Sequence, residues 1–120
     1  MSLDLFGDLT MQGMEFALNS LSDRMQVLAN NIANSQTPGY QAQDVSFEGQ
    51  LASILNGEDT ATPMATGQVV NSPDVSTRID GNTVGMDSEM GRLSETVLMY
   101  NALTQLTTDR LGILKNAITG

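Results

Sequence analysis

Two long stretches of the sequence repeat apolar residues at alternating spacings of three and four positions. The first runs from Met11 to Ile32 and the second from Met86 to Ile118. This heptad pattern is typical of helices that pack along one side, whereas a strand alternates every second residue. The chain is therefore predicted to be built on two long amphipathic helices.

The first stretch, called here the N-terminal stripe, predicts a helix from about Thr10 to Asn34. The hydroxyl of Thr10 suits an N-cap, and no Gly or Pro follows between Met14 and Asn34. Such a helix is roughly 37 Å long at 1.5 Å per residue. The members of the N-terminal stripe are Met11, Met14, Leu18, Leu21, Met25, Leu28 and Ile32.

The second stretch, called here the C-terminal stripe, predicts a helix from about Asp87 to Ile118, roughly 48 Å long. Asp87 or Ser88 suits its N-cap. Gly91 and Gly112 each cost about 1 kcal/mol relative to Ala and locally soften the helix. The members of the C-terminal stripe are Met86, Met90, Leu93, Val97, Tyr100, Thr104, Thr107, Leu111, Leu114 and Ile118.

The middle of the chain, from Gln41 to Gly85, has no sustained period. Asp44 to Leu55 suits either a short helix or an extended stretch. Asn56 to Thr77 is rich in Thr, Ser, Asn, Gly and Pro, which predicts a loop. Within the middle of the chain, residues 68–70 and 75–79 are expected to pair as short, weak strands.

The predicted fold class is all-α, with the two helices forming a coiled-coil-like pair around a long irregular middle loop with short β segments. The chain is accordingly predicted to have three parts. Residues 1–40 form the N-terminal helix and a turn, 41–85 a flexible middle segment, and 86–120 the C-terminal helix.

Two helices with one apolar stripe each bury too little surface to form a stable monomer by themselves. We therefore expect the stripes to be covered by copies of the chain or by other proteins. Methionine-rich stripes pack adaptably, which suits a surface that contacts several different neighbours.

The composition excludes several classes of function. Five Lys and Arg residues against 14 Asp and Glu residues give a net charge of −9, and the chain has no His and no Cys. A Ser–His or Cys–His nucleophile and a thiolate or imidazole metal site are therefore excluded. The acidic charge argues against nucleic-acid binding.

An enzyme is not expected, and neither is a cofactor. The acid–base candidates would be Asp80, Asp87 and Glu89, but no His orients them and no phosphate-binding loop is visible. The segment from Asp80 through Asn82 faintly resembles a calcium-binding loop. Its twelfth position is Gly91 where such loops have Glu, so a calcium site is rejected.

The N-terminus carries Asp4 and Asp8, no cation before Arg24 and no apolar run of secretory-signal length. No run approaches about 18 consecutive apolar residues, so membrane insertion is not expected. General secretion rules then predict a cytoplasmic protein, or one that leaves by a route independent of cleavable signals.

The end of the first predicted helix carries the most informative motif. Pro38 and Gly39 suit the two central positions of a type II turn, in which Gly supplies the positive φ. A helix stop accounts for this turn but not for three Asn in five residues, which a surface bonded to neighbouring chains would explain. The motif consists of Asn30, Asn31, Ile32, Ala33, Asn34, Thr37, Pro38, Gly39 and Tyr40.

This motif resembles the signature of the bacterial flagellar rod and hook proteins. A second segment resembles the entry to the C-terminal helix in the proximal rod members of that family, and Tyr100 fits their helix tyrosine. The resemblance covers about residues 10–55 and 80–118. The second segment contains Gly81, Asn82, Thr83 and Val84.

The resemblance implies a structural subunit of the proximal rod of the flagellar basal body, in the periplasm. It implies synthesis in the cytoplasm and export by the flagellar type III apparatus without a cleaved signal. Folding would occur on assembly into a helical tube that transmits torque. The implied partners are further rod subunits, both copies of the chain and neighbouring proximal rod proteins, together with membrane-ring and export-gate adaptor proteins and the export apparatus.

The pair Phe47 and Leu51 is similar to the export-gate recognition pattern of early flagellar substrates. Two apolar residues one helical turn apart that simply pack locally account for it equally well. For the whole chain, the alternative function is an autonomous, dimeric, acidic coiled-coil adaptor or chaperone in the cytoplasm.

Overall fold

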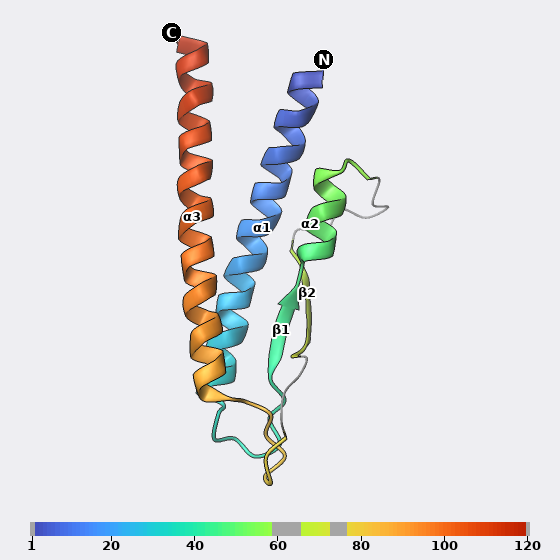
Figure 1. Ribbon diagram of the computed structural model, residues 1–120, viewed down its shortest axis with the longest axis vertical. Helices are drawn as coiled ribbons and strands as arrows, with labels where there is room; N and C mark the ends of the chain where they lie inside the picture. Colours follow the sequence, from blue (N-terminus) through green and yellow to red (C-terminus); the bar gives the residue numbers. More distant parts are fainter. Residues whose placement is uncertain (1, 59–65, 73–76, 120) are drawn as a thin grey trace.

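The computed structural model describes residues 2–58, 66–72 and 77–119, with side chains from residue 9 onward. The molecule is an elongated helical hairpin with extents of 62 × 30 × 17 Å (Figure 1). The helices α1 (Ser2–Ala33) and α3 (Met86–Thr119) run antiparallel, so both chain ends lie at the same end of the hairpin. The predicted fold class, two long helices around a mostly irregular middle, is confirmed.

The helix boundaries agree with the sequence prediction except at the start of α1. This helix begins at Ser2, so Thr10 lies inside it and the predicted N-cap there is wrong. Gly7 and Gly13 lower helix propensity by about 1 kcal/mol each but do not interrupt the backbone hydrogen bonds, as a proline would. The other boundaries differ from the prediction by about one residue, within the usual uncertainty of helix ends. Because α3 begins at Met86, Asp87 and Ser88 lie inside its first turn, and the predicted N-cap at one of them is also wrong.

A small sheet and a short helix α2 (Glu48–Leu55) line the side of α1 opposite α3 (Figure 1). Strand β1 (Gln43–Ser46) pairs antiparallel with β2 (Gln68–Asn71), with Val45 opposite Val69. The segment 44–55 thus contains both structures that the sequence left open, a strand followed by a helix.

The predicted pairing of residues 68–70 with 75–79 is wrong. Residues 68–70 pair with β1, residues 77–79 lie in no strand, and 73–76 are outside the described residues. Val45 is fully buried, so β1 is anchored against α1 and offers β2 a fixed edge. At Gly67 a Cβ atom would lie 2.5 Å from the Ser46 carbonyl oxygen, so only glycine lets β2 approach this closely.

The hydrophobic core lies midway along α1, where the strand and α2 cover it. Phe16 and Phe47 contact edge to face, with ring centroids 6.4 Å apart. The core is small, which agrees with the shortage of aromatic residues in the sequence. Its buried members are Phe16, Ala17, Leu21, Val45 and Phe47.

The face that α3 turns toward the rest of the chain contains polar residues. Glu89 and Thr96 are buried, and the Thr107 hydroxyl donates to the Met14 sulfur at 3.5 Å. Leu93 and Tyr100 of the C-terminal stripe are half-buried in this face. Much of the rest of that stripe is exposed, because the residues that meet α1 are offset from it around the helix.

Candidate functional site

The two motifs singled out in the sequence meet at the turn end of the hairpin. Residues 30–43, at the end of α1 and beyond, lie against residues 78–84, which lead into α3 (Figure 1). We call these two segments, together with Glu89, the junction. It joins positions more than forty residues apart, and buried asparagines occupy its centre.

Asn31 is the central side chain of the junction and is fully buried. Its Nδ2 donates to the Gln43 carbonyl at 2.7 Å and to Glu89 Oε2 at 2.9 Å. Its Oδ1 accepts from the Gln43 backbone N–H at 3.0 Å and from the Tyr40 hydroxyl at 3.4 Å. One amide thus bonds α1 to the start of β1 and to the first turns of α3.

Asn82 plays the corresponding part from the second motif and is also fully buried. Its Nδ2 donates to the carbonyls of Asn34 at 2.9 Å and Thr37 at 2.6 Å. Its Oδ1 accepts from the Val84 backbone N–H at 2.7 Å. Because the last carbonyls of a helix lack partners inside the helix, Asn82 acts as a cap for the end of α1 supplied from a distant segment.

Two tight turns lie against each other at the outer tip of the junction. Gly39 has φ 76°, and the Tyr40 N–H donates to the Thr37 carbonyl at 3.2 Å, as a type II turn requires. Gly81 has φ 81°, and a Cβ atom there would lie 3.4 Å from the Gly39 Cα. The Gly39 N–H donates to the Asp80 carbonyl at 2.8 Å, so the turns are bonded directly.

Hydrogen bonds between Thr83 and the chain leaving the first turn complete the junction. The Thr83 N–H donates to the Tyr40 carbonyl at 3.0 Å, and its Oγ1 accepts from the Ala42 N–H at 2.8 Å. Val84 is buried beside them. All four residues of the Gly81 to Val84 segment therefore take part in packing or bonding at the junction.

These contacts change the interpretation of the asparagine-rich motif. Asn31 bonds within the chain, and Asn34 does so too, through Nδ2 to the Asn30 carbonyl at 2.8 Å and through Oδ1 to the Thr37 hydroxyl at 3.1 Å. Neighbouring chains are therefore not needed to explain these two asparagines. Of the three asparagines in the motif, only Asn30 is exposed.

The carboxylate of Asp80 is held by the turn that contains it. The hydrogen bond from the Asn82 backbone N–H is the main cause that lowers the pKa of Asp80 below its ordinary value. A smaller desolvation effect raises this pKa, whereas Arg78, 3.5 Å away, lowers it further.

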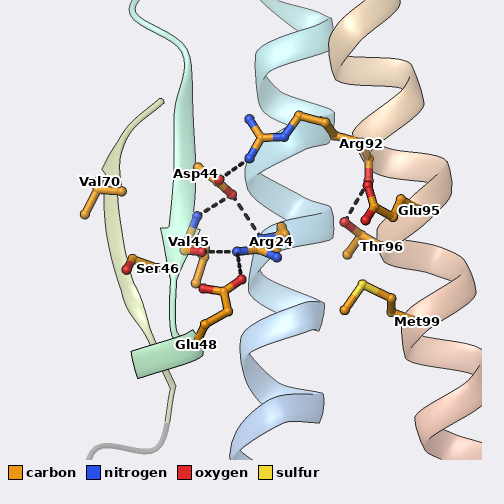
Figure 2. A pocket seen from close by; sticks show the side chains of 10 residues that line it. All are labelled: Arg24, Asp44, Val45, Ser46, Glu48, Val70, Arg92, Glu95, Thr96 and Met99. Atoms are coloured by element: carbon orange, nitrogen blue, oxygen red, sulfur yellow. Dashed lines mark hydrogen bonds and ion pairs between the residues drawn. The ribbon is translucent and has the colours of Figure 1, made fainter. Parts of the chain in front are cut away.

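A cluster of charges binds β1 to both long helices (Figure 2). Asp44 accepts from Arg24 Nε of α1 at 3.0 Å and from Arg92 of α3. Arg24 also donates to Glu48 Oε1 at 2.9 Å and lies 4.7 Å from the centre of the Phe47 ring. These residues line a polar pocket of about 350 Å³. Arg24 and Arg92 are two of the five cations of the chain.

Two arginines and two carboxylates balance in these ion pairs, and Glu95, which lines the same pocket, adds a further carboxylate. Burial alone raises the pKa of Glu48, but the hydrogen bond and charge of Arg24 and the backbone N–H groups of Glu48 and Phe47 outweigh it. The pKa of Glu48 is therefore lowered. Sequence reasoning missed the cluster, although the excess of acidic residues was a signal that arginines such as Arg24 and Arg92 would have carboxylate partners.

The residues of the export-like pattern lie in the core region. Phe47 is buried, Leu51 is half-buried, and the Leu51 N–H donates to the Phe47 carbonyl at 2.9 Å. In the folded chain these side chains pack against α1, so a receptor would reach Phe47 only when this region is open.

The two stripes differ in how far the chain covers them. Leu21 and Leu28 of the N-terminal stripe are buried, and its other members are half-buried. Apolar side chains are exposed on the C-terminal half of α3, where Leu111 is 51% exposed, Leu114 46% and Ile118 85%. Further exposed members of the C-terminal stripe are Met86, Met90, Val97 and Thr104.

The described part of the chain lacks both a metal-binding cluster and a membrane-spanning helix. It contains no group of three or more His, Cys, Asp or Glu residues placed to hold a metal ion. Among the same residues, no helix has both the length and the apolar character needed to cross a membrane.

The helical hairpin and its asparagine junction are arrangements that pack helices together. A family model described as flagella basal body rod protein matches residues 15–41. That match spans the second half of α1 and the first turn of the junction. The class is therefore that of the flagellar rod proteins.

Relatives that match most of the chain identify one family within the flagellar rod proteins. The chain is 33% identical to the flagellar basal body rod protein FlgB of Bacillus subtilis, over 92% of this chain and 94% of that one. It is also 33% identical to FlgB of Salmonella typhimurium, over 94% and 95% of the two chains, and to FlgB of Escherichia coli, over 78% and 80%. The chain belongs to the FlgB family of flagellar basal body rod proteins.

Proposed function

We propose that this chain is a structural subunit of the proximal rod, exported unfolded by the flagellar type III apparatus and folded on assembly. It packs into a helical tube that transmits torque. Its neighbours are copies of itself, other proximal rod proteins and the adaptor proteins of the membrane ring and export gate. The three-part division at residues 40 and 85 separates the helical parts that assemble from the segment between them.

The observation that carries this proposal is the bare apolar surface on the distal half of α3. Burying one Leu-sized side chain contributes about 1.5–3 kcal/mol, so covering several of them strongly favours association. Leu111 and Leu114 are about half exposed, and Ile118 is almost fully exposed. Assembly would supply that cover and offset the entropy lost when long helix ends become ordered.

The small core supports export as an unfolded chain. A channel that passes extended polypeptide favours subunits whose folded state is easily opened, and here five buried residues form the core cluster. Opening that core also exposes Phe47, with Leu51 one turn further on, in the arrangement that resembles the export-gate pattern. The proposed export signal is thus available before folding and buried afterwards.

No catalytic role is proposed, because the family is structural and the arrangement of side chains serves packing. Long helices packed side by side resist shear better than loops do. A tube whose walls are α1 and α3 from many subunits would transmit rotation through helix contacts.

The test is deletion of the gene in its own organism. We expect loss of swimming and basal bodies that lack a rod beyond the inner-membrane ring, seen by electron microscopy, with both restored by the intact gene. Normal swimming of the deletion strain would refute the proposal. A purified chain that melts cooperatively as a stable dimer at micromolar concentration would instead favour the autonomous coiled-coil adaptor.

A further inference from the structure

An apolar groove of about 420 Å³ runs along α1 between α2 and α3. In Figure 1 these two helices lie on opposite sides of α1, so each supplies one wall. The α1 residues of the groove include Gly13, which has no side chain, and Ala17. Its walls include Leu51 and Leu55 of α2 and Leu103 and Leu106 of α3.

Gly13 determines how α2 lies against α1. A Cβ atom at this position would meet Leu55 Cδ2 at 2.7 Å. Glycine thus lets α2 approach closely, while Ala102 on α3 adds a second small residue to the opposite wall. Apolar residues of α1, α2 and α3 thus line the groove together, and such a surface suits the apolar face of a further helix.

We propose that this groove receives residues 111–118 of α3 from a second copy of the chain. This inference rests on the proposed function, because it names the contact through which one rod subunit binds the next.

The occupant has the pattern that such a groove requires. Leu111, Leu114 and Ile118 follow one another at spacings of three and four and share one face of α3. Their stretch is roughly 10 Å long, whereas the α1 side of the groove, from Thr10 to Leu21, is roughly 16 Å long. The apolar face therefore fits within the length of the groove.

The occupant cannot come from the same chain. Leu106 lines the groove, and Leu114 lies eight residues further along the continuous helix α3, roughly 12 Å beyond it. A helix without a break cannot fold back on itself. The segment must therefore reach the groove of another copy.

Charge favours the same pairing. Residues 110–119 contain Arg110 and Lys115 and no carboxylate, a charge of +2, which leaves −11 on the rest of a chain whose total is −9. The end of α3 is therefore attracted to the body of a neighbouring copy and not to the same end of that copy. Because the two contacting surfaces differ, the contact repeats from copy to copy and builds a ring or an open helical assembly, depending on the rotation between copies.

The chain has no cysteine, so single Cys variants test this contact directly. A strain without its own gene would carry two tagged copies, one Ala102→Cys and the other Leu114→Cys, and its basal bodies would be treated with a short bis-maleimide. We expect the mixed product to exceed that of a Gln105→Cys and Leu114→Cys control pair about tenfold, because positioned thiols have a high effective concentration. Gln105 is exposed on α3 and does not line the groove.

Several results would overturn the inference. These are an absence of excess mixed product, a dominant product between two Leu114→Cys copies, or a product between Leu114→Cys and a different rod protein. Should the Cys strain fail to swim, mixtures of the two purified full-length variants at high concentration provide the same comparison. Lys115→Glu should lower the yield of the mixed product severalfold, whereas Lys115→Arg should leave it unchanged.

The outcome is separable from that of the proposed function. Swimming restored by the Cys variants without the mixed product refutes only the groove contact. Swimming in the deletion strain itself refutes the rod assignment, whatever the cross-linking shows.

Discussion

Single buried asparagines determine which parts of this chain meet. Asn31 bonds to both backbone groups of Gln43 and to Glu89, and Asn82 caps the end of α1. Apolar residues tolerate many packing arrangements, whereas a buried amide requires its partners at defined positions. The junction therefore fixes the register of the two helices as well as contributing to stability.

We predict that Asn31→Ala lowers the free energy of unfolding by about 2–4 kcal/mol, because the buried Glu89 carboxylate and the part-buried backbone groups of Gln43 lose this partner. Urea unfolding followed by circular dichroism measures this loss. Asn30→Ala is the matched control, since Asn30 is exposed and adjacent, and its effect should stay within about 0.5 kcal/mol.

Asn31→Asp separates hydrogen bonding from packing. It keeps the size of the side chain but places a carboxylate beside that of Glu89, where Asn31 normally donates. At neutral pH it should destabilise at least as much as Asn31→Ala. Equal stability of Asn31→Asp and the native chain would contradict the assigned role of this amide.

The lowered pKa of Glu48 predicts a loss of stability in acid. A carboxyl group with a lower pKa in the folded than in the unfolded chain stabilises the fold above the unfolded value, here 4.5, and this contribution disappears as the pH falls through the folded value. We expect the urea midpoint to fall as the pH is lowered below about 4.5. Glu48→Gln and Asp80→Asn should each flatten that dependence, and an unchanged slope in both would refute the cause.

At this scale the sequence revealed the important residues but not their partners. The asparagine motif and the Gly81 to Val84 segment were both recognised, yet local spacing says nothing about contacts between residues so far apart. The sequence prediction missed the ion pair of Arg24 and Asp44 for the same reason. Such pairs depend on the path of the chain between them.

At the scale of elements, periodicity predicted the long helices because it depends only on neighbouring turns. It did not identify which face of α3 meets α1. Glu89 and Thr96 are buried there while Leu98 and Ile113 are exposed, since apolar residues surround much of this helix. The β1–β2 pairing was also missed, because it depends on the burial of Val45 and on the small size of Gly67.

Two glycines give opposite predictions for substitution by alanine. Gly91→Ala should raise the free energy of unfolding by about 0.5–1 kcal/mol, since nothing lies within 4 Å of the added Cβ and helix propensity improves. Gly67→Ala should lower it by about 1–3 kcal/mol, because the Cβ would clash with the Ser46 and Phe47 backbone. Thermal unfolding distinguishes the two, and equal shifts would contradict the described β1–β2 approach.

At the scale of the whole molecule, the two ends of the hairpin differ in their bonding. The turn end contains the junction and the charge cluster, whereas the end with the termini presents exposed apolar residues on α3. A subunit of this kind has one end whose geometry is set within the chain. Under the proposed function, neighbouring subunits cover its other end.

We predict that Leu21→Asp combined with Leu28→Asp leaves export intact and abolishes rod assembly. Both leucines are buried in α1, and each unpaired charge there should cost about 4 kcal/mol or more, whereas an unfolded chain in transit is indifferent to them. The measurements are the amount of subunit outside the inner membrane and rods seen in isolated basal bodies.

Leu21→Met with Leu28→Met is the matched control and should support swimming, because the volume of the core is kept. Loss of export in the Asp variant, or rods assembled from it, would contradict the separation of the two steps.

Because of the junction, the relative position of the two long helices does not depend on the length of chain between α2 and β2. Since Asn31, Asn82 and Glu89 already hold the start of α3 beside the end of α1, residues added after the exposed Gly57 would not move either helix. Each doubling of such a loop costs only about 0.6 kcal/mol in closure entropy. The hairpin is therefore a scaffold into which a whole additional domain could be inserted, so subunits of very different size could share one assembly geometry.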